Sequence, residues 1–234
     1  MQLERKLGRP TRGIATKFGL CYVWRVINGE NAMSWIKTIA YDDADARLRP
    51  LYDRVSGPDN NVDNIMMSHA LRPHSMEGHM AIYKAVLHHK DNSLPKWFLE
   101  TIGVWVSLRN QCQYCVEHHF VGLKRGLRND AKADAIRAGF EAGAVSVPEL
   151  SEAQNAAMIY AAALTDDPAR VDETLIHAMR DAGLSDGEIL EVNQVTAYFA
   201  YANRTVLGLG CSLVGDDIGL SPNNSDDPND WAHR

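Results

Sequence analysis

The sequence has little cysteine, no long uncharged apolar run and no regular strand pattern, and each absence excludes a class of protein. Four cysteines among 234 residues are too few for a disulfide-rich scaffold. No stretch approaches the roughly 20 uncharged apolar residues that a membrane helix needs, so we expect no membrane partner. Apolar residues make up 45% and charged residues 23%, a globular mix that excludes disorder, collagen or a coiled coil for the whole chain. The net charge of −6 gives no indication of nucleic-acid binding.

The two ends of the chain differ in charge from the part between them. Residues 1–32 carry six basic and two acidic side chains, a net +4, and their apolar run is interrupted by Arg25 and makes a poor signal peptide. We expect a flexible basic extension there, with a targeting segment as the alternative, and a cytoplasmic protein. Residues 216–234 carry five aspartates against Arg234, a net −4, with little to bury, and this predicts a disordered acidic tail. The domain itself is expected at 33–215.

Apolar spacing and capping residues predict helices throughout that domain. No segment shows sustained strand alternation, and hairpin signals between such segments are missing, so we expect an all-α fold. Capping boxes are predicted where Ser151 precedes Gln154 and where Ser185 precedes Glu188. Further helix starts are expected at Ser93, at Asn129 and at Asp167 before Pro168. The expected helices cover about 42–55, 64–71, 74–91, 94–108, 111–126, 129–139, a stretch after 151, a stretch after 167, and 186–207.

Two of the cysteines, Cys112 and Cys115, are spaced for chemistry. At positions i and i+3 of a helix they are about 60° apart around the axis, so their sulfurs can meet in a disulfide. A helix N-terminus lowers the pKa of a thiol and favours the thiolate, which is the nucleophile. His119 lies four residues after Cys115 and can act as the base that takes the thiol proton. His118 is also within reach, and spacing alone does not choose between the two histidines.

Glu100 is the candidate partner for the histidine. It precedes Cys112 by twelve residues, which on one continuous helix would separate the two by about 18 Å. The polar residues 109–111 offer a place for the helix to turn back, and Glu100 would then approach His119 and orient its ring. Apolar neighbours indicate that this carboxylate is partly buried, and a buried carboxylate needs a partner.

The pattern Glu100-x11-Cys112-x2-Cys115-x3-His119 resembles that of the AhpD-like alkylhydroperoxidases in the carboxymuconolactone decarboxylase superfamily. Residues 107–119 are similar to the peroxidase-related branch, and the likeness covers about residues 35–215. The resemblance implies an all-α, homo-oligomeric bundle (dimer, trimer or hexamer). A histidine stands before the second cysteine in the best-known member, and here that residue is Tyr114. Tyr114 and His118 are therefore only auxiliary candidates.

The resemblance also implies a peroxidase mechanism. Cys115 would attack the peroxide and become a sulfenic acid, and Cys112 would resolve it to a disulfide. Glu100 and His119 would form the proton relay. Cys112 is expected to be the more exposed cysteine, and a dithiol or a thioredoxin-like protein would open the disulfide there. The catalytic set is thus Cys115, Cys112, His119 and Glu100, with no cofactor and no metal because sulfur carries the electrons.

Two other functions compete with the peroxidase. Cys112, Cys115, His118 and His119 could be zinc ligands, although no second C-x-x-C is present. The chain could also be a non-catalytic helical oligomer that binds a small ligand. A looser group of histidines is expected at the surface or in ordinary structural roles, with a contact to a substrate channel as the alternative. His88 and His89 are suited as cations to a helix C-terminus. That group comprises His69, His74, His79, His88 and His89.

Overall fold

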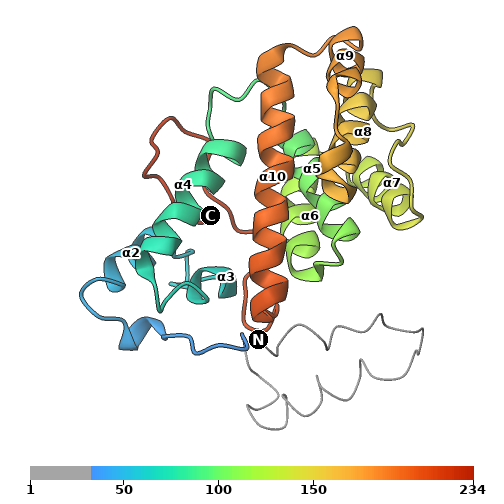
Figure 1. Cartoon of the computed structure of the whole chain (residues 1–234). Coiled ribbons are helices and arrows are strands. Elements are labelled where there is room, and N and C mark those ends of the chain that lie inside the picture. Colours follow the sequence, from blue (N-terminus) through green and yellow to red (C-terminus); the bar gives the residue numbers. More distant parts are fainter. Residues whose placement is uncertain (1–32) are drawn as a thin grey trace, which may run out of the picture. The chain divides into compact units, whose positions relative to one another are not determined.

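The computed structural model describes residues 33–234, and its regular elements are helices (Figure 1). The predicted all-α class is confirmed for this part of the chain. The predicted extension at 1–32 lies outside the described residues. The elements are η1 (Tyr41–Asp43), α2 (Arg49–Val55), α3 (Asn64–Met67), α4 (Pro73–Leu87), α5 (Lys96–Arg109), α6 (Gln113–Leu127), α7 (Asp130–Glu141), α8 (Glu152–Asp166), η2 (Pro168–Arg170), α9 (Glu173–Asp181) and α10 (Asp186–Leu209).

Helices α5, α6 and α10 form the centre of the bundle. Helix α5 is buried over most of its length and packs most extensively against α6 and then against α10. Gly103 permits this approach, because a Cβ atom there would lie 2.2 Å from the ring of Phe199 on α10. Helices α7, α8 and α9 lie on one side of α10 in Figure 1, and α4 lies on the other. The chemistry-bearing segment is therefore held by the most buried elements of the molecule.

The side chains that cap α7, α8 and α10 act as the sequence predicts. Asn129 accepts a hydrogen bond from the backbone of Lys132, and both predicted capping boxes are complete. Helix α10 ends at Gly210, which adopts the left-handed conformation (φ 64°) that glycine tolerates. These ends are fixed by short-range hydrogen bonds, and such bonds can be read from a sequence.

Two other predicted starts are wrong, and the start at Asp167, with Pro168 in the first position, is right in place but opens only a short element. The helix expected over 42–55 is a short turn followed by α2, because Pro50 lacks an amide hydrogen and is tolerated only in a first turn. Ser93 does not cap α5: its amide donates to Glu191 on α10, and Pro95 is the N-cap residue. Asp167 makes no side-chain capping bond, and only the short η2 follows it.

The acidic C-terminal segment, residues 216–234, differs from the predicted disordered tail. It follows α10 and is fixed on the bundle beside α4 (Figure 1). Trp231 is buried, and the Arg54 guanidinium lies 3.5 Å from its ring centroid. Lys90 pairs with Asp226 at 2.6 Å, so basic groups of the bundle offset the negative charge of the segment. Composition alone does not reveal such partners, because they are far away in the sequence.

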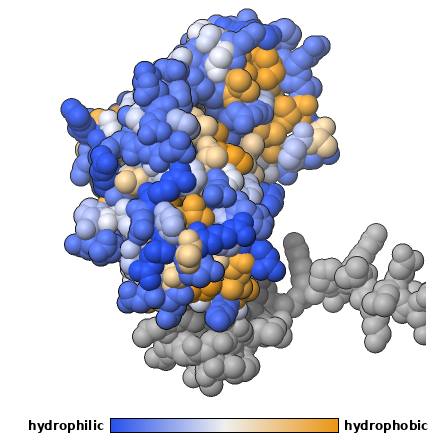
Figure 2. Space-filling view, turned by 90° about the vertical axis from the view of Figure 1, so that its left-hand side faces the viewer, coloured by the Kyte–Doolittle hydropathy of each residue, from blue (hydrophilic) through white to orange (hydrophobic). Residues whose placement is uncertain are grey.

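The described surface is mainly hydrophilic. Figure 2 shows one face on which apolar residues form separate patches among polar ones. Within residues 33–234, no helix combines the length and the apolar character needed to cross a bilayer.

Candidate functional site

The site is built at the corner between α5 and α6. Helix α5 ends at Arg109, and Gln111 adopts the left-handed conformation (φ 59°), which reverses the chain. The Cys112 amide then donates to the carbonyl of Ser107 at 2.8 Å, and Cys112 becomes the N-cap residue of α6. This turn places Glu100 on α5 beside the cysteines and histidines on α6.

The two thiols lie side by side as a reduced pair. Their sulfurs are 3.2 Å apart, and both cysteines are free. The hydrogen bond between them lowers the pKa of Cys112 and, together with burial, raises the pKa of Cys115 well above the ordinary thiol range. The first proton is therefore lost from the pair more readily than the second. Asn203 on α10 also interacts with both thiols and favours their charged forms.

The prediction that Cys112 is the more exposed cysteine is wrong. Its side chain is 0% exposed and that of Cys115 is 3% exposed. Cys112 is covered because the corner packs against α10, where Val206 joins the same buried cluster. Of the two cysteines, Cys115 is the one that lines the cavity described below.

Glu100 and His119 form a pair in which the carboxylate is buried and the imidazole is partly exposed. The Glu100 Oε2 atom lies 2.7 Å from His119 Nδ1, and the carboxylate side chain is only 1% exposed. Gly122, one turn after His119, makes room for it, since a Cβ atom there would lie 2.7 Å from Glu100 Oε1. The His119 ring also packs edge-on against Phe199, with 4.5 Å between ring centroids. The carboxylate and the aromatic contact fix the orientation of the imidazole.

His118 and Tyr114 face the C-terminal segment. His118 Nδ1 accepts a hydrogen bond from the Gly219 amide at 3.4 Å, and its Nε2 lies 3.5 Å from Asp216. The Tyr114 hydroxyl donates to Asp216 at 2.5 Å and accepts from the Ile65 amide at 3.2 Å. Burial raises the pKa of Tyr114 well above its usual range, so its hydroxyl keeps its proton. The two histidines thus have different partners: His118 contacts the C-terminal segment and His119 contacts Glu100.

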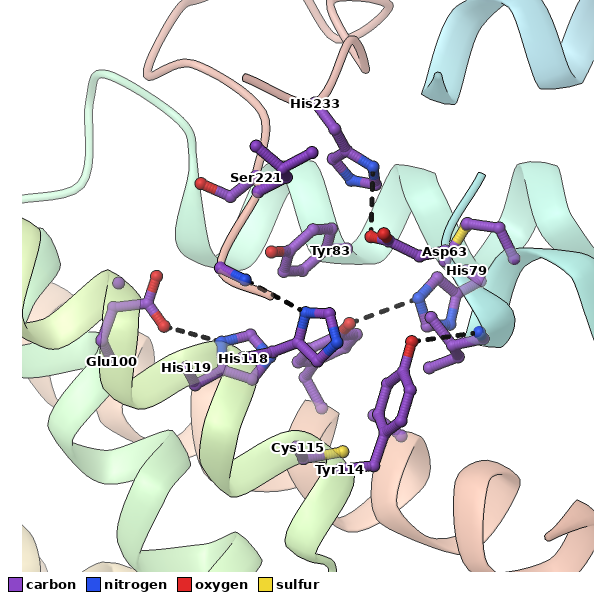
Figure 3. A pocket seen from close by; sticks show the side chains of 17 residues that line it. Asp63, His79, Tyr83, Glu100, Tyr114, Cys115, His118, His119, Ser221 and His233 are labelled. Atoms are coloured by element: carbon purple, nitrogen blue, oxygen red, sulfur yellow. Dashed lines mark hydrogen bonds and ion pairs between the residues drawn. The ribbon is translucent and has the colours of Figure 1, made fainter. Parts of the chain in front are cut away.

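A small cavity of about 40 Å³ joins these groups (Figure 3). Cys115, His118 and His119 contribute to its wall, together with Glu100 and Tyr114. Sequence reasoning missed several further lining residues that come from distant segments: Asp63, His79, Tyr83, Tyr198, Gly219, Leu220, Ser221 and His233. Only His79 carried a signal, as one of the loose histidine group.

Three members of that histidine group are not surface residues. His69, His79 and His88 are buried, and burial lowers the pKa of each, that of His79 to about 3. The rings of His69 and His79 lie 5.2 Å apart between centroids, although ten residues separate them. His88 follows α4 as its C-cap residue but is uncharged there, so the expected stabilisation of a cation at that helix end does not apply to it.

The zinc alternative finds no ligand set in the described part of the chain. Across residues 33–234, no group of three or more histidine, cysteine or acidic side chains is arranged to hold a metal ion. The predicted ligands point to other partners instead: Cys112 to Cys115, His118 to Gly219 and Asp216, and His119 to Glu100.

Comparison with known proteins identifies the fold. We found no protein-family model and no curated protein that matches the sequence. Among solved structures, the chain is similar to the alkylhydroperoxidase AhpD core of a peroxidase-related protein from Ralstonia eutropha JMP134. The identity is 26% and the TM-score 0.65, over 77% of this chain and 92% of that chain. A peroxidase-related protein from Silicibacter sp. TM1040 is 22% identical with a TM-score of 0.58, over 64% of this chain and 76% of that one.

A third similar structure is the debrominase Bmp8, as a cysteine-to-alanine variant in complex with 2,3,4-tribromopyrrole. It is 17% identical, with a TM-score of 0.61 over 77% of this chain and 91% of that one. The chain has the AhpD-like fold, and the predicted resemblance to AhpD-like, peroxidase-related proteins is confirmed. Because a debrominase shares this fold, the reaction has to be argued from the site.

Proposed function

We propose that the protein is a thiol-dependent peroxidase that reduces hydrogen peroxide and small organic hydroperoxides through Cys115 and Cys112. The observation that carries the proposal is a reduced thiol pair, 3.2 Å apart, with one member in a cavity beside a histidine that is paired with a buried carboxylate. A structural disulfide would need neither the cavity nor the histidine. A non-catalytic binding module would need neither thiol.

The reaction balances on these groups. The Cys115 sulfur attacks one peroxide oxygen, the O–O bond breaks, and the other oxygen leaves as water or an alcohol after taking a proton. Cys115 is then a sulfenic acid. The Cys112 sulfur attacks it, the disulfide forms, and a water molecule leaves. An external dithiol or a thioredoxin-like protein returns two electrons and two protons.

The electrostatics of the thiol pair favour a proton relay. The pKa of Cys115 is raised, so at neutral pH its sulfur carries a proton that must leave before attack. His119 lines the same cavity and is oriented by Glu100, so it is the group to accept that proton and pass it to the leaving oxygen.

Substitution of each cysteine tests the proposal. Cys115→Ser should abolish peroxide consumption in an assay coupled to dithiothreitol. Cys112→Ser should stop turnover but allow Cys115 to be trapped as a sulfenic acid, detected by dimedone labelling and mass spectrometry. Cys211→Ser is the matched control, because that thiol is also free and lies outside the pair. Peroxide consumption by Cys115→Ser at the wild-type rate would contradict the proposal.

The oligomeric state needs a separate experiment. We infer a homo-oligomer from the resemblance, and analytical ultracentrifugation of the purified protein measures its state.

The alternative of a non-catalytic binding module is distinguished by thiol reactivity, since such a module has no reason to keep Cys115 reactive. Iodoacetamide labelling of the reduced protein at neutral pH, read at Cys115, distinguishes the two.

A further inference from the structure

The cavity beside Cys115 is closed by the C-terminal segment of the same chain. Gly219, Leu220, Ser221 and His233 line it, and Figure 3 shows Ser221 and His233 across the pocket from Cys115. The remaining lining comes from the helices and from the loop before α3. One wall of the thiol pocket is thus made by residues that follow the last helix.

The start of this wall is fixed by hydrogen bonds to buried groups. The Asp216 carboxylate accepts from the Tyr114 hydroxyl at 2.5 Å and from the Asn64 amide at 2.9 Å. The Asn64 side chain donates to the carbonyls of Ser212 and Val214 at 2.8 and 2.9 Å. These bonds set where the chain passes over the pocket.

The far end of the segment is fixed as well. Lys84 on α4 is buried and donates to the carbonyl of Asn223 and, at 2.9 Å, to the Ser225 hydroxyl. His233 Nδ1 lies 3.4 Å from a carboxylate oxygen of Asp63, so the last residues return to the pocket. Buried anchors on both sides of residues 219–221 hold them in place.

Gly219 lets the segment pass close to α6. Its φ of +91° favours glycine, and a Cβ atom there would lie 2.3 Å from Val121. Its carbonyl accepts from Arg125 at 2.7 Å and its amide donates to His118 at 3.4 Å. The backbone therefore touches the helix that carries Cys115, and no space is left between them.

We propose that residues 216–233 determine the substrate size of the thiol pocket, admitting hydrogen peroxide and the smallest alkyl hydroperoxides and excluding bulky ones. This inference rests on the proposed peroxidase function. The cavity measures about 40 Å³, while a single buried water needs roughly 10–15 Å³. We therefore expect an aryl or lipid hydroperoxide to be kept from Cys115 while the segment is in place. Leu220 and Ser221 are the residues that set the limit, and Gly219 sets how closely they approach.

The test compares two glycine substitutions in the full-length protein. Gly219→Val introduces a side chain that collides with Val121 and displaces the wall. Gly143→Ala is the control: its φ is +93° and a Cβ atom there meets nothing within 4 Å, so it adds backbone strain away from the pocket. Leu220→Ala is a second wall variant that widens the cavity without changing the backbone.

Two readouts are taken from each variant. The first is the rate of Cys115 oxidation by hydrogen peroxide relative to cumene hydroperoxide, measured by stopped flow. The second is Cys115 alkylation in the reduced protein by N-ethylmaleimide relative to fluorescein maleimide, two reagents of different size with the same reactive group, read by peptide mass spectrometry. We expect strong preference for the small reagent in the wild type and in Gly143→Ala. In Gly219→Val or Leu220→Ala that preference should fall by at least about tenfold.

The outcomes separate this proposal from the proposed function. If the alkylation preference falls but neither peroxide oxidises Cys115, the segment limits size and the peroxidase proposal is wrong. If wild-type Cys115 reacts equally with large and small reagents, the size limit is refuted. It is also refuted if the preference is unchanged in both wall variants. Should Gly219→Val not fold, Leu220→Ala decides alone.

Discussion

Cys115 and Cys112 share one hydrogen bond but have different surroundings. Cys115 lines the cavity beside His119, whereas Cys112 is enclosed at the helix corner and has the lowered pKa. The thiol that peroxide can reach is therefore not the one that ionises more easily. A base in the cavity removes this conflict, and His119 with Glu100 supplies it.

Glu100→Gln tests whether the Glu100–His119 pair is needed for the oxidation of Cys115. Glutamine keeps the size of the side chain but removes the carboxylate whose Oε2 atom lies 2.7 Å from His119 Nδ1. We expect the rate of Cys115 oxidation by hydrogen peroxide to fall about 100-fold, as when an acid–base group is lost. The measurement is stopped-flow oxidation of the reduced protein under single-turnover conditions.

Glu117→Gln is the matched control for this change. Glu117 is on the same helix as His119, but it pairs with Arg137 at 2.8 Å and does not line the cavity. We expect an unchanged oxidation rate. Wild-type oxidation by Glu100→Gln, with the control unaffected, would remove Glu100 from the relay.

At the scale of the elements, the site depends on how closely α5 and α10 approach. Gly103 on α5 faces Phe199 on α10, and the Phe199 ring is also the edge-on neighbour of His119. Packing between the two helices and orientation of the base are thus coupled through one aromatic ring. The sequence carries no signal for this role, because Gly103 looks there like any helical glycine.

Gly103→Ala should therefore weaken both the fold and the site. Its new Cβ atom would lie 2.2 Å from the Phe199 ring, and overpacking of this kind costs about 1–3 kcal/mol of unfolding free energy. We also expect slower oxidation of Cys115 because the His119 ring shifts. Urea unfolding and stopped-flow oxidation measure the two effects.

Gly78→Ala on α4 is the control, since a Cβ atom there meets nothing within 4 Å. It should raise the unfolding free energy by about 0.5–1 kcal/mol, because alanine loses less backbone freedom in a helix. Equal effects of the two substitutions would show that Gly103 has no special packing role.

For the molecule as a whole, the local features could be predicted from sequence and the long-range ones could not. The helices, the caps at Ser151 and Ser185 and the spacing of Cys112 and Cys115 follow from neighbours within about four residues. The pocket wall depends on Asp216 meeting Tyr114 across 102 positions, and such a contact leaves no periodicity. By composition the acidic segment resembles a solvated tail, because the basic residues that hold it on the bundle are distant in the sequence.

The buried histidines predict how stability changes with pH. Burial lowers the pKa of His79 to about 3 and of His233 to about 4, and it also lowers those of His69 and His88. The unfolded chain binds these protons below about pH 6.5 while the folded protein does not, so acid favours unfolding. Burial raises the pKa of Asp63 from 3.8 to about 7, and this group has the opposite effect. Its contribution to stability is lost as the pH rises from 3.8 to about 7, because the unfolded chain releases this proton first. Because four histidines act in one direction and only Asp63 in the other, we expect the free energy of unfolding to fall as the pH is lowered from about 6.5 to 4.

Urea unfolding from pH 7.5 to 4.5 measures this dependence. Each titrating group contributes at most about 1.4 kcal/mol per pH unit. His79→Gln should flatten the curve and Asp63→Asn should steepen the loss in acid. His74→Gln is the control, because His74 is an exposed histidine on the same helix as His79. A wild-type curve that stays flat from pH 7.5 to 4.5 would contradict the assignment.

The enclosure of Cys112 also bears on the order of events during turnover. With Cys112 0% exposed and Cys115 3% exposed, both sulfurs of the disulfide would be covered. A cavity of about 40 Å³ that excludes an aryl hydroperoxide also excludes a dithiol or a thioredoxin-like protein. Peroxide would then react while residues 216–233 are in place, whereas reduction of the disulfide would require that segment to move away, so the two half-reactions would use different positions of the C-terminal segment.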